Sequence, residues 1–207
     1  MARCLVAALF LAFVAPMVAA AAEAEPNPAV GRLNHAGYSK KRHCTFVAVA
    51  PRVALTAAHC VDDLPVDELH LLFGYQRMSF AAKAGVAEVH RLGRDSAALC
   101  LGSEAPAWIP IGGPVARNDT VQLVGYGVPR VHLQQSNTCK VWTPVGDEIL
   151  LDCASAPGSS GAPVLDGAGE VVAVVSRTGR GSSYAVSVSV DAVQACEHLG
   201  DAQPGEG

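Results

Sequence analysis

Short segments that favour β-strands follow one another along most of the chain, with Gly, Pro and Asn between them. This pattern is typical of an all-β sandwich or barrel. Only the C-terminal end has helical spacing, with a capping residue at Ser189 and apolar residues at every third position after it. The predicted strands are 44–50, 53–56, 69–73, 86–91, 97–101, 120–126, 138–142, 148–152, 163–166, 170–177 and 183–188.

The first 22 residues have the pattern of a secretory signal peptide. Arg3 precedes an unbroken apolar run over 4–15, Pro16 ends the run, and three alanines at 20–22 suit signal peptidase. A cut after Ala24 is a second possibility, and a retained membrane anchor is the alternative because residues 4–22 are long enough to cross a bilayer. The leader predicts a secreted or periplasmic protein, with an extended segment at 23–28.

Composition excludes several classes of protein. Half of the 207 residues are apolar, which is incompatible with a largely disordered chain. The net charge is −4 and no long basic run is present, so the chain is not expected to bind nucleic acid. We interpret the one basic cluster, residues 40–43, as a solvated loop or strand edge. No membrane association is expected after the leader is removed.

Export changes the interpretation of the cysteines. Cys4 leaves with the leader, and an even set in an exported chain predicts disulfides. Zinc is the alternative, because His43-Cys44 and His59-Cys60 look like ligand pairs. Paired CxxC spacing is missing, however, so we predict no metal. The six remaining cysteines are Cys44, Cys60, Cys100, Cys139, Cys153 and Cys196.

Three polar residues are candidates for nucleophilic catalysis, in which a base activates a serine and a carboxylate orients the base. Ser160 lies in the turn Gly-Ser-Ser-Gly at 158–161, where glycines allow a tight bend; the alternative is an ordinary hairpin turn. His59 ends an apolar run, and the alternative is a packed core histidine. Asp95 precedes the apolar strand 97–101, and the alternative is a loop acid.

Together these segments resemble the motifs of the chymotrypsin-like serine proteases. Thr-Ala-Ala-His-Cys at 56–60 matches the histidine motif, Asp95 with its strand resembles the aspartate segment, and 158–163 is similar to Gly-Asp-Ser-Gly-Gly-Pro. Val-Gly-Tyr-Gly at 124–127 resembles the strand that opens the second barrel. The resemblance covers about 30–199 and implies an all-β fold of two packed six-stranded antiparallel β-barrels, at 29–112 and 113–188. A short C-terminal helix at 189–200 and a polar tail at 201–207 would follow.

The resemblance also implies roles for individual residues. His59 would be the general base, Asp95 its orienting acid and Ser160 the nucleophile of a serine endopeptidase. The backbone N–H groups of Gly158 and Ser160 would form the oxyanion hole. A polypeptide substrate would pair with the strand at Ser176, Arg177 and Thr178, where Arg177 either favours acidic substrate residues or points into solvent. No cofactor is implied, and a monomer is expected.

For the cysteines, Cys44 and Cys60 match the bridge that the family has beside its histidine. Cys139 and Cys153 flank a predicted hairpin, so a second bridge is expected there. Cys100 and Cys196 remain, either as a bond between the C-terminal helix and the first barrel or as two free buried thiols.

Three positions depart from the family pattern. Ser159 replaces the aspartate that receives a new N-terminus in many animal members, so we predict no activation by N-terminal insertion. Ala162 replaces a glycine, which requires a negative φ at that position. Ala154 stands where trypsin-like members have an acid, so a preference for Arg or Lys is not expected unless Asp152 takes over that role.

Two rival functions remain. One is an inactive protease homologue that works as a binding module, which a serine-reactive probe would reveal. The other is an α/β-hydrolase, because residues 158–162 nearly fit Gly-x-Ser-x-Gly. That fold needs its histidine last in the chain and crossover helices, whereas His59 comes first here and helical patterns are scarce.

Overall fold

The structure is a computed structural model that describes residues 24–35 and 43–197. The predicted leader at 1–22, the polar tail at 201–207 and residues 40–42 of the basic cluster lie outside the described residues.

The first barrel contains six antiparallel strands. Their order around the closed sheet is β1-β2-β3-β6-β5-β4, so the chain passes from β3 across the barrel to β4 before returning. The strands are β1 (Val30–His35), β2 (His43–Ala50), β3 (Val53–Thr56), β4 (Leu69–Phe73), β5 (Ala82–Arg91) and β6 (Ala97–Leu101).

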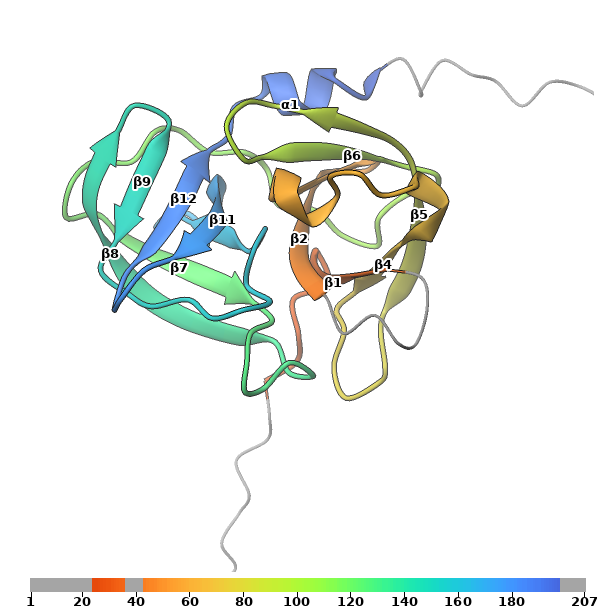
Figure 1. Cartoon of the computed structure of the whole chain (residues 1–207), viewed down its shortest axis with the longest axis horizontal. Helices are drawn as coiled ribbons and strands as arrows, with labels where there is room; N and C mark the ends of the chain where they lie inside the picture. The colour runs from red at the N-terminus through yellow and green to blue at the C-terminus, as the bar shows by residue number, and fades with distance from the viewer. Residues whose placement is uncertain (1–23, 36–42, 198–207) are drawn as a thin grey trace, which may run out of the picture.

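The second barrel repeats this arrangement in the order β10-β11-β12-β9-β8-β7. Figure 1 shows the two barrels side by side, with the later one in green to blue. The predicted fold class is therefore confirmed. The strands are β7 (Thr120–Gly125), β8 (Gln135–Val145), β9 (Glu148–Leu151), β10 (Pro163–Leu165), β11 (Val171–Thr178) and β12 (Ser183–Ser187).

An apolar core fills each barrel, and a third apolar cluster joins them. Strand β6 shows how one strand serves two cores. Leu99 and Leu101 point into the first barrel, whereas Ala98 and Cys100 pack in the cluster that also holds Val124 and Val174 of the second barrel. This double burial explains why residues 97–101 are continuously apolar rather than alternating, as a strand buried on both faces requires.

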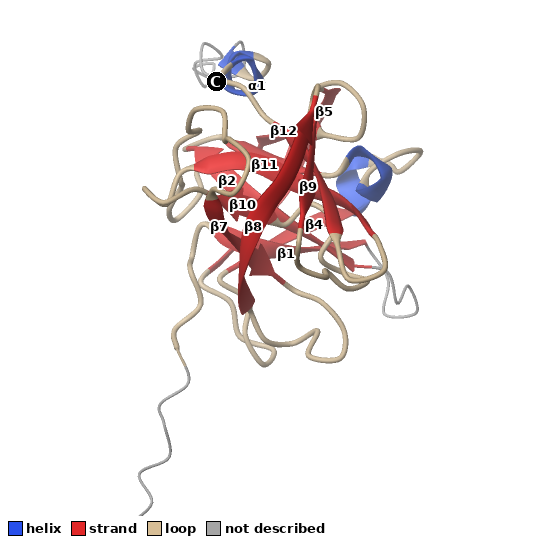
Figure 2. Cartoon of the chain, turned by 90° about the vertical axis from the view of Figure 1, so that its left-hand side faces the viewer, coloured by secondary structure: helices blue, strands red, loops and turns tan. Residues whose placement is uncertain are grey.

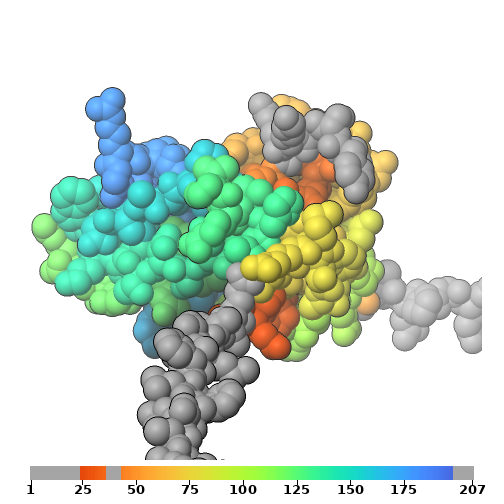
Figure 3. Space-filling view, turned by 90° about the horizontal axis from the view of Figure 1, so that it is seen from below, coloured from red at the N-terminus to blue at the C-terminus, as the bar shows by residue number. Residues whose placement is uncertain are grey.

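On the face seen in Figure 3, the loop after β7 reaches the β4–β5 hairpin of the first barrel. There the backbone N–H of Arg77 donates a hydrogen bond to the carbonyl of His132 at 2.8 Å. Contacts between the barrels therefore include polar loop contacts as well as the apolar cluster.

Three strands differ by more than one residue at an end from the sequence-based expectations. No strand was predicted at β1, because Gly31 and Asn34 interrupt its apolar residues. The glycine is needed for packing: a Cβ at Gly31 would lie 2.3 Å from the Phe46 ring. Strand β8 extends three residues further at each end than the predicted 138–142, and β5 begins at Ala82 rather than at residue 86.

The C-terminal helix is shorter than the predicted 189–200. Helix α1 spans Asp191–Gln194, and residues 198–200 lie outside the described part. Ser189 does not cap it: Val190 is the N-cap residue, and the Ser189 hydroxyl bonds the Asp191 carboxylate at 3.0 Å instead. Figure 2 shows α1 above the strands. Two short 3₁₀ turns, η1 (Ala58–Cys60) and η2 (Val66–Glu68), also lie within the described residues.

The two predicted disulfides are present, and so is the third pairing, which the sequence left open. They join Cys44 to Cys60, Cys139 to Cys153 and Cys100 to Cys196, so the last pair is bonded rather than free. The Cys100–Cys196 bond attaches the segment after α1 to β6 of the first barrel. Among residues 24–35 and 43–197, none of the helices has both the length and the apolar character needed to cross a bilayer.

Candidate active site

His59 lies in the 3₁₀ turn η1, directly after β3. The alanines before it are fully buried, and Cys60 after it is bonded to Cys44 on β2. Small buried residues on one side and a disulfide on the other hold this turn firmly. The His59 side chain is nevertheless 48 % exposed, so it is not the packed core histidine that was the alternative.

Asp95 lies in the loop before β6 and contacts His59 through both carboxylate oxygens. His59 Nδ1 is 3.0 Å from Oδ1 and 2.9 Å from Oδ2, and the His59 backbone N–H donates to Oδ1 at 3.0 Å. The Ser176 hydroxyl, from β11 of the second barrel, donates to Oδ2 at 2.5 Å. With Nδ1–H directed at the carboxylate, the neutral imidazole presents Nε2 as a proton acceptor.

The electrostatics of this contact favour an ionised Asp95. Partial burial by itself raises the pKa of Asp95. Hydrogen bonds from Ser176 and from the His59 backbone and ring lower the pKa by more than burial raises it, so the pKa of Asp95 lies below its ordinary value. A carboxylate at this position stabilises a positive charge on the His59 ring when that ring takes up a proton.

Ser160 lies in the loop between β9 and β10, and two glycines give this loop its shape. Gly158 has a φ of +102° and Gly161 a φ of +80°, values that side chains rarely adopt. A Cβ at Gly161 would also lie 2.2 Å from the Thr45 carbonyl oxygen. The turn therefore needs glycine at 161 both for its backbone angle and for its close approach to the first barrel.

Next to the Ser160 side chain, the backbone N–H groups of Gly158 and Ser160 have no hydrogen-bond acceptor among the described residues. Their neighbours are engaged, since Ser159 N donates to the Ala156 carbonyl at 2.9 Å and Gly161 N donates to the Val175 carbonyl at 2.7 Å. An oxyanion site needs donors of this kind, already oriented and available to a ligand.

Thr45 on β2 holds the serine loop against the first barrel, and sequence reasoning missed it. Its N–H donates to the Ser160 carbonyl at 2.8 Å, and its hydroxyl donates to the Gly158 carbonyl at 2.9 Å. The same hydroxyl accepts from Tyr126 N at 3.0 Å. The sequence signal that could have found it is a polar residue within an apolar strand segment, Cys-Thr-Phe-Val; in the structure Thr45 is fully buried.

His43 is a second residue that the sequence misplaced. It was interpreted as part of a solvated loop or strand edge; it is the first residue of β2, but it is half-buried rather than solvated. A Cβ at Gly158 would lie 2.3 Å from its Nε2, so the ring packs directly on the serine loop. Burial lowers the pKa of His43 to about 4, with a smaller contribution from the positive charge of Arg32.

The candidate residues of both barrels line one open cleft of about 640 Å³. His59, Arg94 and Asp95 come from the first barrel, and Ser160 comes from the second. Within the described part of the chain, no hydrogen bond joins the His59 and Ser160 side chains. The second barrel also contributes Glu148, Ala156, Pro157, Ser176, Arg177 and Thr178 to the lining.

The three residues expected to pair with a substrate differ in exposure. Ser176 is 4 % exposed and binds Asp95, whereas Arg177 and Thr178 are exposed at the cleft. Arg177 does not simply point into solvent, because its guanidinium contacts Glu148 at 2.8 Å.

The departures from the family motif have local explanations. Ala162 is fully buried and is not among the residues with positive φ, so its methyl group is accommodated as expected. Ser159 is 6 % exposed and packs beside Gly127. Asp152 does not line the cleft; its carboxylate accepts a hydrogen bond from Lys140 N at 2.6 Å.

One cluster resembles a metal site. Potential ligand atoms of Cys44, His59 and Cys60 lie within 4.8 Å of one another. Both sulfurs are consumed in the Cys44–Cys60 disulfide, so neither is a thiolate that binds zinc.

A cleft between two six-stranded barrels, with a histidine, an aspartate and a serine along it, defines the class of chymotrypsin-like serine proteases. The profile of the trypsin-like peptidase domain family matches residues 44–174, which include all three of these side chains. The chain belongs to this family. A comparison with curated proteins finds no match.

Solved structures with this fold have low sequence identity to the chain. The thermostable serine protease AL20 from an extremophilic microorganism is 15 % identical with a TM-score of 0.70, over 86 % of this chain and 99 % of its own. Protease Anisep from Arthrobacter nicotinovorans is 15 % identical with a TM-score of 0.69, over 87 % and 99 %. The scabies mite inactivated protease paralogue S-D1 is 11 % identical with a TM-score of 0.70, over 86 % and 95 %.

Proposed function

We propose that this protein is an exported serine endopeptidase that cleaves polypeptides through an acyl-enzyme intermediate. The observation that carries the proposal is the oriented His59–Asp95 pair, which lines the same cleft as Ser160. The N–H groups of Gly158 and Ser160 support it, because they are available to stabilise an oxyanion.

In the first half of the reaction, Ser160 Oγ attacks the carbonyl carbon of the scissile peptide bond, and His59 Nε2 takes the hydroxyl proton. The carbonyl oxygen becomes an oxyanion that accepts hydrogen bonds from Gly158 N and Ser160 N. Asp95 stabilises the imidazolium without taking its proton. His59 then donates the proton to the leaving nitrogen as the C–N bond breaks, which leaves an ester on Ser160.

In the second half, water replaces the amine. His59 removes a proton from the water as its oxygen attacks the ester carbonyl, and the same two N–H groups bind the second oxyanion. The proton returns to Ser160 Oγ as the ester C–O bond breaks, which releases the new carboxyl terminus. These steps need no metal and no organic cofactor.

Export and solution state are further parts of the proposal. Three disulfides are consistent with an extracellular location, and we propose a secreted or periplasmic enzyme that works as a monomer. We also propose that activity does not need a free N-terminus inserted beside Ser159, because a serine lacks the charge to pair with an amine. Activity that depends on one N-terminal cut would refute this part.

A second candidate function is a binding module without catalysis. One observation favours it: the His59 and Ser160 side chains share no hydrogen bond in the described chain. Hydrogen bonds between catalytic groups are often long before substrate binds, so this geometry does not exclude activity.

Labelling with a fluorophosphonate probe distinguishes the two candidates, since the probe reacts with an activated serine. We expect the disulfide-intact protein to be labelled on Ser160, and Ser160→Ala to abolish both labelling and peptide cleavage. Ser159→Ala is the matched control, which should still be labelled. Absence of labelling, with a control protease labelled alongside, would favour the binding module and contradict the proposed catalysis.

A further inference from the structure

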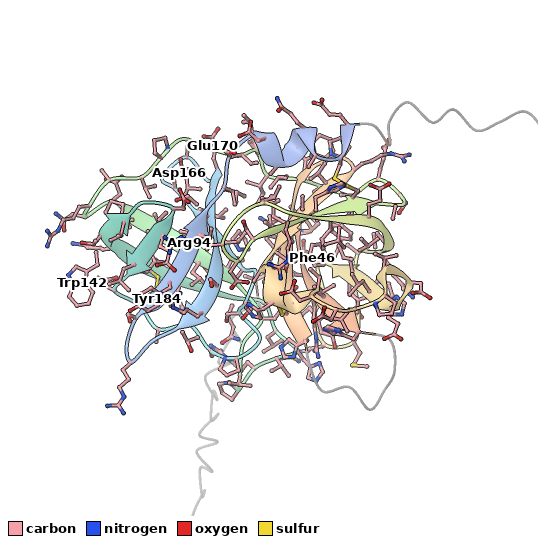
Figure 4. All side chains as sticks on the ribbon, turned by 45° about the horizontal axis from the view of Figure 1, so that its top comes forward. Phe46, Arg94, Trp142, Asp166, Glu170 and Tyr184 are labelled. Carbon is pink, nitrogen blue, oxygen red and sulfur yellow. A yellow bond between two sulfur atoms is a disulfide. The ribbon has the colours of Figure 1, made fainter. Side chains whose placement is uncertain are left out.

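Two arginines from different barrels meet at the cleft beside the proposed nucleophile. Arg94 comes from the loop between β5 and β6 of the first barrel, and Arg177 comes from β11 of the second. In Figure 4, Arg94 lies where the two barrels adjoin. Both side chains line the same cleft as His59 and Ser160.

Their positions depend on the residues next to them in sequence. Arg94 precedes Asp95, and Arg177 follows Ser176; Asp95 and Ser176 are joined by the 2.5 Å hydrogen bond across the barrels. The backbone of each arginine is therefore one residue away from a contact that joins the two barrels.

Glu148, the first residue of β9, holds the two arginines together. Its Oε1 is 2.8 Å from Nη1 of Arg177, and its Oε2 is 3.7 Å from Nη1 of Arg94. The Arg177 guanidinium also stacks on the Tyr184 ring, with its central carbon 4.1 Å from the ring centroid. A planar cation held on an aromatic ring and paired on one edge loses little further freedom when it binds an anion.

The side chains of the two arginines are more exposed than that of the glutamate between them. The side chains of Arg94 and Arg177 are 63 % and 54 % exposed, whereas that of Glu148 is 19 % exposed. Glu148 also lines the cleft, but its carboxylate is the least exposed of the three charged groups. Two cations share one anion, and the surface of this group of three residues carries a net positive charge toward the cleft.

We propose that Arg94 and Arg177 form a subsite for an acidic side chain of the polypeptide substrate, within a few residues of the bond that is cut. A glutamate or aspartate carboxylate would accept hydrogen bonds from the exposed edges of both guanidinium groups, which suit carboxylates in geometry and charge. This inference rests on the proposed function, because it concerns the substrate of the same cleft.

The test uses quenched fluorescent peptides that differ at one position, occupied by Glu, Gln or Lys, with that position moved residue by residue along the peptide. At one position near the cut we expect kcat/KM for the Glu peptide to exceed that for the Gln peptide by about fivefold, as for an ion pair at a partly exposed site. The ratio should fall as sodium chloride is raised, because salt screens exposed charges.

Variants assign this preference to the two arginines. Arg177→Gln and Arg94→Gln should each bring the Glu to Gln ratio toward one. Arg117→Gln is the matched control: Arg117 is an exposed arginine that does not line the cleft, so its variant should keep the ratio. Equal cleavage of the Glu and Gln peptides at every position would overturn the inference. So would a preference for Lys that is lost in Glu148→Gln, since Glu148 would then be the recognising group.

A binding measurement separates this inference from the proposed chemistry. The Ser160→Ala variant cannot form the acyl-enzyme, so we expect it to bind the Glu peptide about fivefold more tightly than the Gln peptide in titration calorimetry. Fluorophosphonate labelling without any discrimination between peptides would leave the protease standing and remove the acidic subsite. Discrimination in binding without labelling would keep the subsite and remove the protease.

Discussion

The two barrels have the same strand order but prepare their parts of the cleft in different ways. The first barrel provides His59 and Asp95 already in contact, on a disulfide-braced turn and at the mouth of a fully buried strand. The second barrel provides Ser160 on a loop whose shape depends on backbone angles that only glycine adopts readily. Side-chain contacts therefore order one half of the cleft, and backbone conformation orders the other.

Neither half is independent of the other. Ser176 of the second barrel donates to Asp95 of the first, and Thr45 of the first barrel holds the serine loop of the second. Each barrel thus supplies hydrogen bonds that position the candidate catalytic residue, or its loop, of the other barrel. The comparison predicts that changes at these crossing contacts affect both halves, whereas changes within one barrel affect one.

The largest effect is expected from Asp95→Asn, which removes the acceptor that orients His59. We expect kcat for peptide cleavage to fall by about 10⁴-fold, the loss known for this substitution in the family's template enzyme. Asp62→Asn is the matched control, since Asp62 pairs with Arg91 and does not line the cleft. Steady-state kinetics on both variants measure the effect, and a loss below tenfold in Asp95→Asn would contradict the role of the first barrel.

The next effect concerns the bond that attaches the C-terminal segment to the first barrel. The Cys100–Cys196 disulfide spans 96 residues and Cys139–Cys153 spans 14. Loop-closure entropy predicts a loss of about 4.7 kcal/mol of unfolding free energy for the longer loop and about 3 kcal/mol for the shorter. Denaturant unfolding of the two alanine double variants measures both losses. A larger loss for Cys139–Cys153 would contradict a stabilisation that scales with loop length.

A smaller effect is expected from Thr45→Val, which keeps the shape of the side chain but removes its hydroxyl. The Gly158 carbonyl and Tyr126 N–H would lose their partner, at a cost of about 1–3 kcal/mol of unfolding free energy. We expect kcat to fall by about tenfold, less than for deletion of an oxyanion donor. Thr120→Val, at an exposed position of β7, is the control. Unchanged kcat in a destabilised Thr45→Val would show that the loop does not need this crossing contact.

The smallest effect is a pH dependence from His43. Its pKa is lowered to about 4 in the folded chain, from 6.5 in the unfolded one. Between these values the unfolded chain binds a proton that the folded chain does not, so stability falls as pH decreases from 6.5 to 4. Because the ring is only half-buried, we expect about 1 kcal/mol rather than the full value of the shift. Unfolding curves of the parent and His43→Gln at pH 7 and pH 4 measure it, and an equal pH response would contradict it.

Sequence reasoning located the strands best where their apolar residues are most strongly constrained. Strands β3, β4 and β6 have the predicted boundaries, since each is short, apolar and ended by a turn residue or by the motif that follows. It missed β1, where Gly31 resembles a turn residue but serves to admit the Phe46 ring. A glycine has the same letter in a turn and in a crowded strand, and only the neighbouring side chains distinguish the two uses.

The candidate site, like the strands, was predicted from the sequence only in part. His59, Asp95 and Ser160 lie in local motifs, so their neighbours in sequence identify them. The family resemblance supplied the Cys44–Cys60 pair, a predicted hairpin supplied Cys139–Cys153, and Cys100–Cys196 was left open. Thr45, His43, Arg94 and Glu148 carry no such motif. Their importance comes from contacts with residues far along the chain, 113 residues apart for Thr45 and Gly158 and 54 (148 − 94) for Arg94 and Glu148, or from the cleft they share, which no local pattern records.

The order of amino acids by itself determined the local features of this protein: which segments pair as strands, which turn needs glycine, and which three polar residues carry the family motif. Tertiary structure alone decided that two arginines from different barrels share one glutamate, and that a threonine of one barrel holds the serine loop of the other. The physical reason is the distance along the chain over which each kind of interaction acts. Strand and turn preferences act over a few residues, whereas hydrogen bonds and ion pairs depend on distances that exist only after both barrels have formed and packed together.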